Sequence, residues 1–528
     1  MSKELLRLAV VGSVDDGKST LIGRLLFERG LLHEDHIAQV KKASKQNGEE
    51  IDFSLFTDGL KAEREQAITI DVAYRHLSTQ RREIVLADTP GHLQYTRNMA
   101  TGASRADAAV VLVDARLGPQ PQTRRHAYIL KLLGVPHVAV AVNKMDAVGY
   151  SKERFEQLRD ELQRYLGGFG FQSLEFFPVS ARRGDNLLQP SEQMPWSRSG
   201  VLGEYLDRVP LERGAKTAWR FPVQYVLRPD QNYRAFAGQL VSGTISQGDE
   251  VVVLPSGQRT KVKAIDGIDG EQPHASAPES IALRLEHEVD VSRGDVLAPA
   301  ADKPRLTREL DAMVVWLSDR PLEIDRPLLV RHLTRAVPGK VSAVNGRVDL
   351  ETLAEHPAQS LGPNEIGRVT VLLSRPLPVD AYSSNRATGA FVLVDPLTNI
   401  TIAAGMVLPP RAGALEQARD VARVTPFERQ HRLGHAAAVV WVERPGDSDG
   451  LEAAAALERA LFERGLSVTL IEADANASLA VAEAGLVAVH AARGDEAQRR
   501  LQRSALAAGP AVLIEAEDAE RIARLLLP

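Results

Sequence analysis

The segment from Gly12 to Ser19 constrains the fold of this chain more than any other, because it fits the pattern G-x-x-x-x-G-K-[ST]. Apolar residues 8–11 precede it and predict a buried strand, and residues 20–26 follow with helical spacing. A strand, a Gly-rich turn and a helix start form a cradle in which backbone N–H groups and the helix dipole hold phosphates. We assign to this cradle Gly12, Ser13, Val14, Asp15, Asp16, Gly17, Lys18, Ser19 and Thr20. We expect Lys18 to reach the terminal phosphates and the Ser19 hydroxyl to bind Mg²⁺.

A second motif follows the apolar strand at residues 84–87 and consists of Asp88, Thr89, Pro90, Gly91 and His92, all assigned to the nucleotide site. An Asp at the end of that strand can hold Mg²⁺ through water. Gly91 lets the backbone approach the γ-phosphate closely. We expect His92 to orient the attacking water, which makes it a catalytic candidate together with Lys18.

A third motif selects the base. It follows the strand at residues 138–142, and a further loop follows residues 176–179. Asp146 offers two acceptor oxygens to two adjacent N–H donors, which guanine presents and adenine does not, so we expect GTP rather than ATP. The nucleotide-binding residues assigned here are Asn143, Lys144, Met145, Asp146, Ser180 and Ala181.

Thr69 lies upstream of the second motif. A Thr at this place would bind Mg²⁺ and sense the γ-phosphate through a mobile loop. The alternative is an ordinary β-branched strand residue. We therefore predict Ser19, Thr69 and Asp88 as metal ligands, and Thr69 as a third catalytic candidate.

These motifs resemble the translational GTPase superfamily, the class of elongation factor Tu. Asp16 departs from members that act on the ribosome, which usually carry His there. Longer stretches resemble the GTPase subunit of bacterial sulfate adenylyltransferase, over roughly residues 3–410; they are 48–60, 96–104, 318–322, 364–369 and 388–391. The resemblance implies that GTP hydrolysis on this chain drives adenylyl transfer from ATP to sulfate on a separate, smaller catalytic subunit. Ala67 and Leu93 depart from the family's usual Gly and Glu, which affects the switch loops but no ligand-bearing residue.

The length of 528 residues predicts about three to four domains. The chain has no Cys, which excludes disulfides and thiolate chemistry, and its net charge is −5. That charge is weak evidence against a nucleic-acid partner, and we expect none. The N-terminus enters a strand at once, without a signal peptide, and no stretch is apolar enough to span a membrane. We therefore expect a cytoplasmic protein.

The pattern along the chain predicts a multidomain fold: an α/β P-loop GTPase domain, two β-barrels as in elongation factor Tu, and a small C-terminal α/β domain. In the last domain, residues 451–464 predict a helix with Leu457, Leu461 and Phe462 on one face. The expected boundaries are 1–213, 217–304, 306–411, a linker at 412–433, and 434–528.

Residues 434–435 with the following strand, the helix from Leu451, residues 470–474 and residues 483–487 resemble adenylylsulfate kinase. The C-terminal domain departs from that family at the phosphate loop. Residues 443–450 contain no Lys, no Lys-Ser or Lys-Thr pair follows Gly450, and acidic residues stand in the loop instead. The domain is also short for a kinase. We predict a degenerate domain without kinase activity.

Two functions remain open from the sequence. The first is the regulatory, GTP-hydrolysing subunit of sulfate adenylyltransferase. The second is a translation-type GTPase that binds transfer RNA or the ribosome, which the GTP motifs alone do not separate from the first. Asp16, the longer stretches and the kinase-like tail favour the first.

Overall fold

The computed structural model describes two compact units, Met1–Pro410 and Arg411–Pro528. Among the residues it describes, no helix is both long and apolar enough to cross a lipid bilayer. The described residues are 3–46, 51–57, 71–211, 217–230, 233–410, 437–443, 447–472, 474–483, 486–492, 495–507, 512–514 and 518–527.

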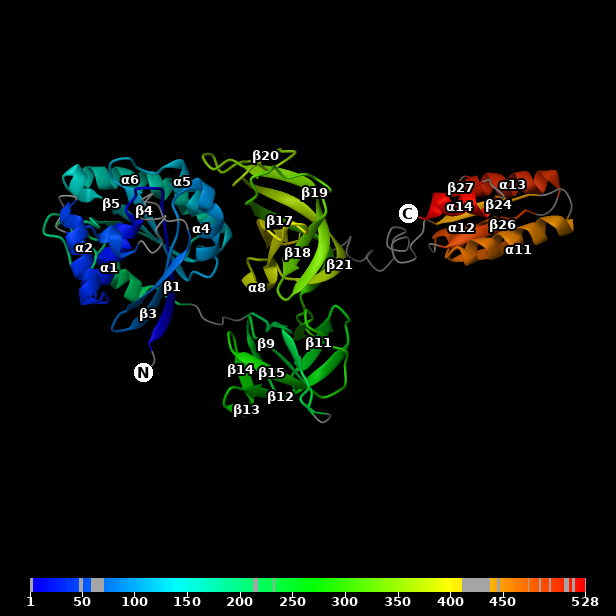
Figure 1. Ribbon diagram of the computed structural model, residues 1–528, viewed down its shortest axis with the longest axis horizontal. Helices are drawn as coiled ribbons and strands as arrows, with labels where there is room; N and C mark the ends of the chain where they lie inside the picture. Colours follow the sequence, from blue (N-terminus) through cyan, green and yellow to red (C-terminus); the bar gives the residue numbers. More distant parts are fainter. Residues whose placement is uncertain are drawn as a thin grey trace. The chain divides into compact units, whose positions relative to one another are not determined.

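A six-stranded sheet forms the first part of the N-terminal unit, with strand order β2-β3-β1-β4-β5-β6 (Figure 1). Only β2 is antiparallel to its neighbour, so the other five strands end at one edge. The register places Val10 beside Asp88, and Asp114 beside Asn143. The motifs that follow these strands are therefore brought together. The strands are β1 Glu4–Val11, β2 Ala73–Ser78, β3 Arg82–Asp88, β4 Ala108–Asp114, β5 His137–Asn143 and β6 Ser173–Pro178.

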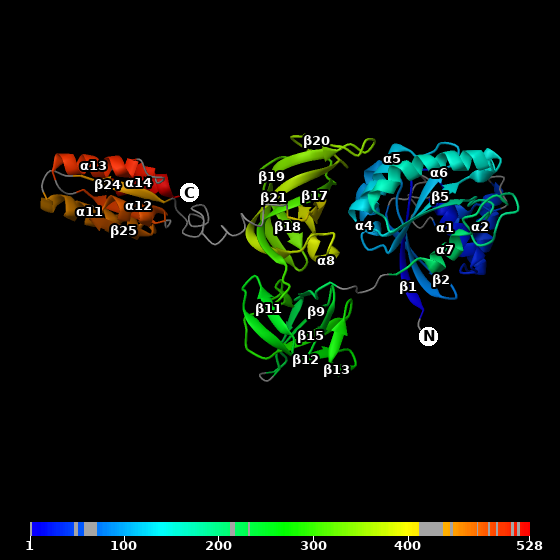
Figure 2. The same ribbon diagram turned by 180° about the vertical axis from the view of Figure 1, so that it is seen from behind.

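Helices cover both faces of this sheet (Figure 2), which explains why every residue of β4 and β5 is buried. Alternate residues of β1 enter the two cores: one contains side chains of α1 and α7, the other those of α4, α5 and α6. Ser151 caps α6 by accepting from the Arg154 N–H. The helices are α1 Lys18–Glu28, α2 Glu34–Gln46, α4 Thr96–Ala103, α5 Pro121–Leu132, α6 Lys152–Leu166 and α7 Leu202–Arg208, with single turns η1 Phe53–Phe56, η2 Leu93–Tyr95, η3 Met145–Val148 and η4 Gly167–Phe169.

The first barrel is closed by the consecutive strands β7 and β8, which form the two ends of the strand order β7-β16-β11-β12-β15-β9-β8. Phe221, Val251 and Val253 lie in its core, whereas Val252 and Leu254, the alternate residues of β11, are buried in a separate small cluster. Its strands are β7 Phe221–Pro222, β8 Tyr225–Leu227, β9 Ala235–Gln239, β10 Thr244–Ser246, β11 Glu250–Leu254, β12 Arg259–Gly267, β13 Gly270–Gln272, β14 His274–Ser276, β15 Ser280–Leu285 and β16 Val296–Pro299.

The second barrel is a closed ring, because the outermost strand β18 also pairs with β19. A short helix, α8 Arg386–Gly389, precedes β22. The strands are β17 Arg305–Trp316, β18 Leu328–His332, β19 Arg335–Val348, β20 Glu355–His356, β21 Ile366–Val379, β22 Ala390–Val394 and β23 Thr401–Val407.

One buried arginine joins the two barrels. The Arg220 guanidinium, from the start of the first barrel, donates to both carboxylate oxygens of Asp380 in the second, at 2.9 and 3.1 Å. Thr388 donates to the same carboxylate at 2.6 Å. The pair is largely removed from water, since the Arg220 side chain is 5% exposed and that of Asp380 14%.

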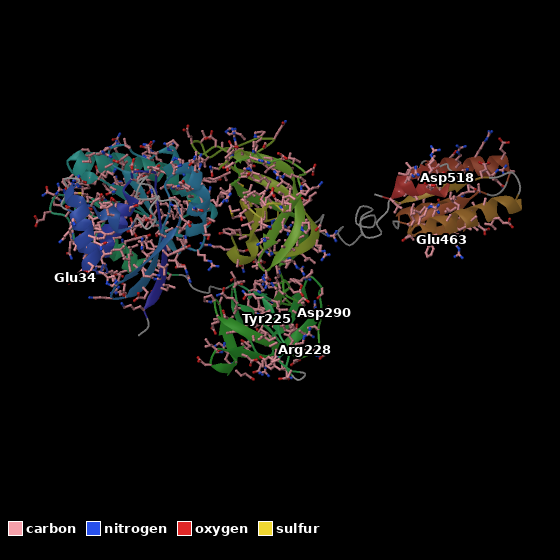
Figure 3. The ribbon with its side chains drawn as sticks, viewed as in Figure 1. Glu34, Tyr225, Arg228, Asp290, Glu463 and Asp518 are labelled. Atoms are coloured by element: carbon pink, nitrogen blue, oxygen red, sulfur yellow. The ribbon has the colours of Figure 1, made fainter. Side chains whose placement is uncertain are left out.

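In its described residues, the C-terminal unit has a parallel four-stranded sheet of order β25-β26-β24-β27 and four helices. In Figure 3, Glu463 marks the end of α11 and Asp518 the start of α14, where its carboxylate accepts from the Glu520 N–H. The elements are β24 Ala438–Val442, α11 Asp447–Glu463, β25 Val468–Glu472, α12 Ala475–Glu483, β26 Val487–Ala491, α13 Glu496–Ala507, β27 Val512–Ile514 and α14 Ala519–Leu526.

The orientation expected for Phe462 is wrong. Leu457 and Leu461, four residues apart, are buried as expected, but Phe462 is 63% exposed. Adjacent residues in a helix point about 100° apart, so Phe462 cannot share the face of Leu461. The predicted linker at 412–433 lies outside the described residues, and the domain boundaries remain predictions.

Candidate functional site: a nucleotide cradle

The phosphate loop connects β1 to α1 through two residues with left-handed backbone. Asp15 has φ 64°, and Gly17, which caps α1, has φ 93°. A Cβ on Gly17 would stand 2.5 Å from the Asn143 side-chain nitrogen, and one on Gly91 would stand 2.4 Å from Lys18 Nζ. Glycine is therefore required at both positions, because the loops approach each other too closely for a side chain.

Lys18 is buried at the centre of this cradle. Its Nζ donates to the carbonyl oxygens of Gly12 at 3.1 Å and Ser13 at 2.7 Å. Burial lowers the pKa of Lys18, and the carboxylates of Asp16 and Asp88 oppose that shift. A buried cation held on backbone carbonyls is well placed to bind phosphate oxygens.

Asp16 closes the loop from inside. Its Oδ2 accepts from the Ser13 N–H at 2.6 Å, and the residue is 1% exposed. Burial raises the pKa of Asp16 to about 6, against the lowering effect of Lys18. The carboxylate therefore fixes the loop's shape at the cost of a buried negative charge.

Asn143 ties the base-recognition motif to the phosphate loop. Its amide nitrogen donates to the Asp16 carbonyl at 2.8 Å, and its Oδ1 accepts from the Ala181 N–H at 2.9 Å. Lys144, at φ 64°, donates to the Asp15 carbonyl and pairs with Asp114 at 2.9 Å. Three motifs far apart in sequence thus form one hydrogen-bonded network.

The Asp146 carboxylate is oriented by Ser180, whose hydroxyl donates to Oδ1 at 2.7 Å. The remaining acceptor, Oδ2, and the free lone pairs suit the paired N–H donors of a guanine edge. The Met145 side chain lies in the hydrophobic core, fully buried, so it supports this loop from behind.

The second motif lies beside the phosphate loop. Thr89 donates to the Val10 carbonyl at 2.7 Å, which fastens the start of the motif to β1. His92 caps the turn η2 and accepts through Nδ1 from the Gln94 N–H at 3.3 Å. Nε2 is then the nitrogen with which His92 can meet a water. Leu93, next to it, is 43% exposed.

A cavity of about 460 Å³ lies over these loops. Of the predicted site residues, it is lined by Val14, Asp15, Gly17, Lys18, Ser19, Thr20, Gly91, His92 and Lys144. The others, apart from Asp146, are buried behind it: Gly12, Ser13, Asp16, Asp88, Thr89, Pro90, Asn143, Met145, Ser180 and Ala181. Thr69 and Ala67 lie outside the described residues, so the role of Thr69 stays a prediction.

Arg116 and Ser54 also line the cavity, and the sequence reasoning missed both. Arg116 is held by Asp114 through three side-chain contacts of 2.7 to 3.2 Å. Asp114 is fully buried and also pairs with Lys144. Burial by itself would raise the pKa of Asp114, but the hydrogen bonds from Arg116 and Lys144 outweigh that effect and lower the pKa to about 2. The available signal was an Asp at the end of an apolar strand, as in the second motif.

A magnesium ion would find oxygen ligands here. Ser19 lines the cavity and Asp88 is buried beside the cradle, and hydroxyl and carboxylate oxygens are ligands that Mg²⁺ accepts. Within the described residues, no group of three or more His, Asp or Glu side chains forms a metal cluster by itself.

The fold and the site define a GTPase of the elongation factor Tu class. The model of the elongation factor Tu GTP-binding domain matches residues 3–217, and that of the eEF1A-like C-terminal domain matches residues 309–408. The chain belongs to the family of sulfate adenylyltransferase subunit 1. The protein of that name from Alteromonas mediterranea is 45% identical over 415 residues, which cover 78% of this chain and 88% of that protein. This confirms the resemblance inferred from the sequence.

Relatives with a second activity in their name match more of this chain. "Bifunctional enzyme CysN/CysC" from Rhodopirellula baltica is 45% identical over 491 residues, 89% of this chain and 76% of that protein. The protein of the same name from Mycobacterium tuberculosis is 44% identical over 481 residues, which cover 89% of this chain and 78% of that protein. Among solved structures, sup35 complexed with GDP is 24% identical and covers 78% of this chain and 95% of that chain. The TM-score of that comparison is 0.36.

Proposed function

We propose that this chain is the GTP-dependent regulatory subunit of a sulfate adenylyltransferase. It hydrolyses GTP and thereby drives formation of adenylylsulfate from ATP and sulfate on a partner subunit. The observation that carries the proposal is the network in which Asn143 joins the phosphate loop to the loop of Ala181. Such a network holds a guanine nucleotide at its base and phosphates together, and the family relationship supplies the sulfate chemistry.

The hydrolytic step needs three functions from the chain's own side chains. Lys18 neutralises charge on the terminal phosphates, because its ammonium lies at the centre of the cradle. His92 orients the attacking water through Nε2. Asp146 holds the guanine edge, so that the γ-phosphate stays in place relative to both.

Magnesium is the cofactor that we propose for this site. When bound, it would neutralise β- and γ-phosphate charge, with Ser19, Asp88 and Thr69 as the residues that hold it. The partner is a smaller, adenylyl-transferring subunit, and no residue of this chain performs the sulfate chemistry. Because GTP and ATP are both cytoplasmic metabolites, the proposal places the complex in the cytoplasm.

The test measures GTP hydrolysis and adenylylsulfate formation by the full chain, alone and with the small subunit, ATP and sulfate. We expect strong stimulation only in the complete mixture, with both activities abolished by Lys18→Ala and His92→Ala. Lys152→Ala, an exposed lysine on α6, is the control that keeps both. Stimulation by ribosomes and none by the small subunit would instead establish the translation-type GTPase.

We propose further that the C-terminal domain has no adenylylsulfate kinase activity. At the end of its first strand, Glu443 accepts from the Trp441 indole at 3.2 Å and pairs with Arg499 at 3.3 Å. A carboxylate there repels phosphate, and the loop sequence lacks the lysine that a phosphate loop uses. Conversion of adenylylsulfate to its 3′-phosphorylated form by the purified chain with ATP would contradict this.

A further inference from the structure

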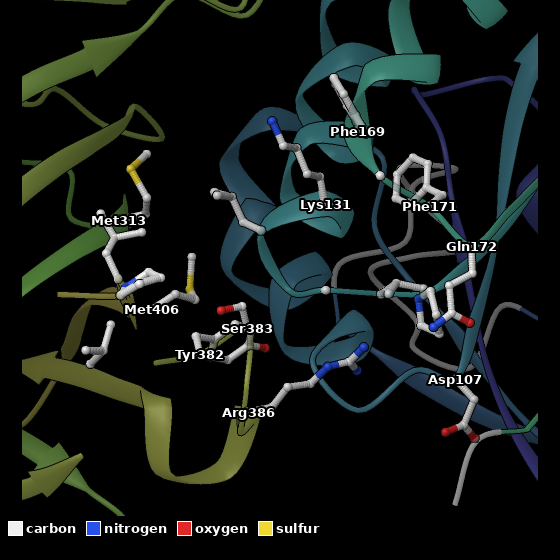
Figure 4. A pocket seen from close by; sticks show the side chains of 18 of the residues that line it. Asp107, Lys131, Phe169, Phe171, Gln172, Met313, Tyr382, Ser383, Arg386 and Met406 are labelled. Atoms are coloured by element: carbon white, nitrogen blue, oxygen red, sulfur yellow. The ribbon is translucent and has the colours of Figure 1, made fainter. Parts of the chain in front are cut away.

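A second and larger cavity, about 740 Å³, is shown from close by in Figure 4. It lies at the edge of the GTPase sheet opposite the nucleotide cradle. Its lining includes the segments that precede β4, β5 and β6, which are the amino ends of parallel strands. The facing wall comes from the second barrel, through β17, β23 and the residues around α8. This volume lies in the range of small-molecule binding sites.

Two cations without an anionic partner line this cavity. Lys131, at the end of α5, lies over the rings of Tyr128 and Phe169 at 4.9 and 5.0 Å. Arg386 approaches from the other wall, with its Nε 3.2 Å from where a Cβ of Gly134 would be. Within the described part of the chain, neither side chain makes an ion pair or a hydrogen bond. Burial also lowers the pKa of Lys131, as expected for an ammonium without a counter-charge.

The remaining walls are apolar and aromatic. Phe169, Phe171 and Tyr382 contribute rings, and Met313 and Met406 contribute flexible, polarisable side chains from the barrel (Figure 4). The cavity's carboxylate, Asp107, accepts from the Arg7 backbone N–H at 2.8 Å and lies 3.9 Å from the Arg7 guanidinium. The field in the cavity is therefore positive.

The cavity also spans a junction. The hydroxyl of Tyr382, in the second barrel, donates to the carbonyl oxygen of Leu133, in the GTPase domain, at 3.0 Å. A ligand between Lys131 and Arg386 would contact both sides at once. Its affinity would then depend on how the GTPase domain meets the barrel, which is the arrangement that a GTP switch alters.

We propose that this cavity binds an adenine mononucleotide with a second acid group, of which adenylylsulfate is the representative. The two cations suit its two negative charges, and the aromatic walls suit its flat base. The choice of adenylylsulfate rests on the proposed function, because that compound is the product of the coupled reaction. The chain would thus sense the product at a site separate from the nucleotide cradle.

The experiment is equilibrium dialysis of the full chain, saturated with GDP, against labelled adenylylsulfate. We expect one saturable site, weakened at least about tenfold by Lys131→Gln and by Arg386→Gln. Lys152→Gln is the matched control, since it removes an exposed cation on α6 and should leave binding unchanged. Unchanged GDP affinity in all three variants verifies folding. Adenosine has the base but not the acid groups, and inorganic sulfate has an acid group but not the base, so each should compete poorly with adenylylsulfate for the cavity.

Two results would overturn the inference. One is no binding of adenylylsulfate by the wild-type chain. The other is binding that both substitutions leave intact, which would place the ligand elsewhere, for example in the kinase-like domain. The partner subunit is absent from the dialysis, so the measurement tests this cavity alone. A failure of the coupled reaction would appear only in the separate assay that includes the partner subunit.

Discussion

At the scale of single residues, the site depends on buried charges that hold one another. Asp16 fixes the phosphate loop, and Asp114 fixes the two cations Lys144 and Arg116. Both carboxylates are almost completely removed from water, yet their pKa values shift in opposite directions, to about 6 and about 2. The difference arises because Asp114 has two directly bonded cations, whereas Asp16 has a backbone N–H and a lysine that bonds elsewhere.

The first prediction concerns the pH dependence of stability in the nucleotide-free chain. The pKa of Asp16 is raised to about 6 from an ordinary 3.8, so the folded state holds this proton more tightly than the unfolded state. The stabilisation is present below about pH 4 and is lost as the pH rises through about 6. Relative to Asp16→Asn, the wild-type free energy of unfolding should fall by about 3 kcal/mol over that range. Denaturant unfolding at several pH values measures this, and parallel pH profiles for the two proteins would refute it.

The second prediction concerns Arg116, which lines the cavity and is anchored by Asp114. Its Nη1 makes no hydrogen bond to any described residue, so it is available to a nucleotide. Arg116→Gln should weaken GDP binding about tenfold, the effect expected when a charge-assisted contact is removed. Arg159→Gln, on the exposed face of α6, is the control. Equal GDP affinities of all three proteins, measured by fluorescent-nucleotide displacement, would show that Arg116 only supports Asp114.

At the scale of secondary-structure elements, the motifs and the strands before them could be predicted, because apolar runs and glycine turns are local signals. That the site residues lie at one edge of the sheet could also be predicted, because the carboxyl ends of parallel strands meet at the same edge. The second cavity could not be predicted, since Lys131 and Arg386 come from elements far apart in sequence. Arg116 was missed because its role depends on the bond to Asp114. Phe462 was assigned to the wrong face of its helix because the prediction ignored the angle of about 100° between adjacent helix residues.

The third prediction tests the face of α11 in the C-terminal unit. Leu461→Ala removes a fully buried side chain and should cost about 2–5 kcal/mol. Phe462→Ala, one residue further, removes a larger but exposed side chain and should change stability by no more than about 0.5 kcal/mol. Hydrogen exchange of β24 and β26 in the full chain reports both. A larger effect at Phe462 would mean that a surface covers it in solution.

At the scale of the whole molecule, the N-terminal unit needs its two barrels to move as one piece if a change at the cradle is to reach a partner. Arg220 and Asp380 supply a buried connection, reinforced by Arg335 and Asp295, which pair at 2.9 Å between second and first barrel. Buried pairs of this kind add little net stability but are costly to break.

The fourth prediction follows from that asymmetry. Arg220→Met leaves Asp380 buried and unpaired and should destabilise the barrels by about 3–5 kcal/mol. The double variant Arg220→Met, Asp380→Leu removes both charges and should recover most of the loss. Urea unfolding followed by the fluorescence of Trp219 and Trp316, one in each barrel core, measures both. No recovery in the double variant would show that shape, rather than charge, joins the barrels.

The ring closure of the barrels has a consequence for self-association. A strand with neighbours on both sides cannot recruit another chain, whereas an unpaired edge is a template for aggregation. The six-stranded sheet of the GTPase domain and the four-stranded sheet of the C-terminal unit do not close on themselves; their outermost strands are β2 and β6 in the first, and β25 and β27 in the second. Concentrated preparations should therefore aggregate through these four strands while both barrels keep their native hydrogen bonds.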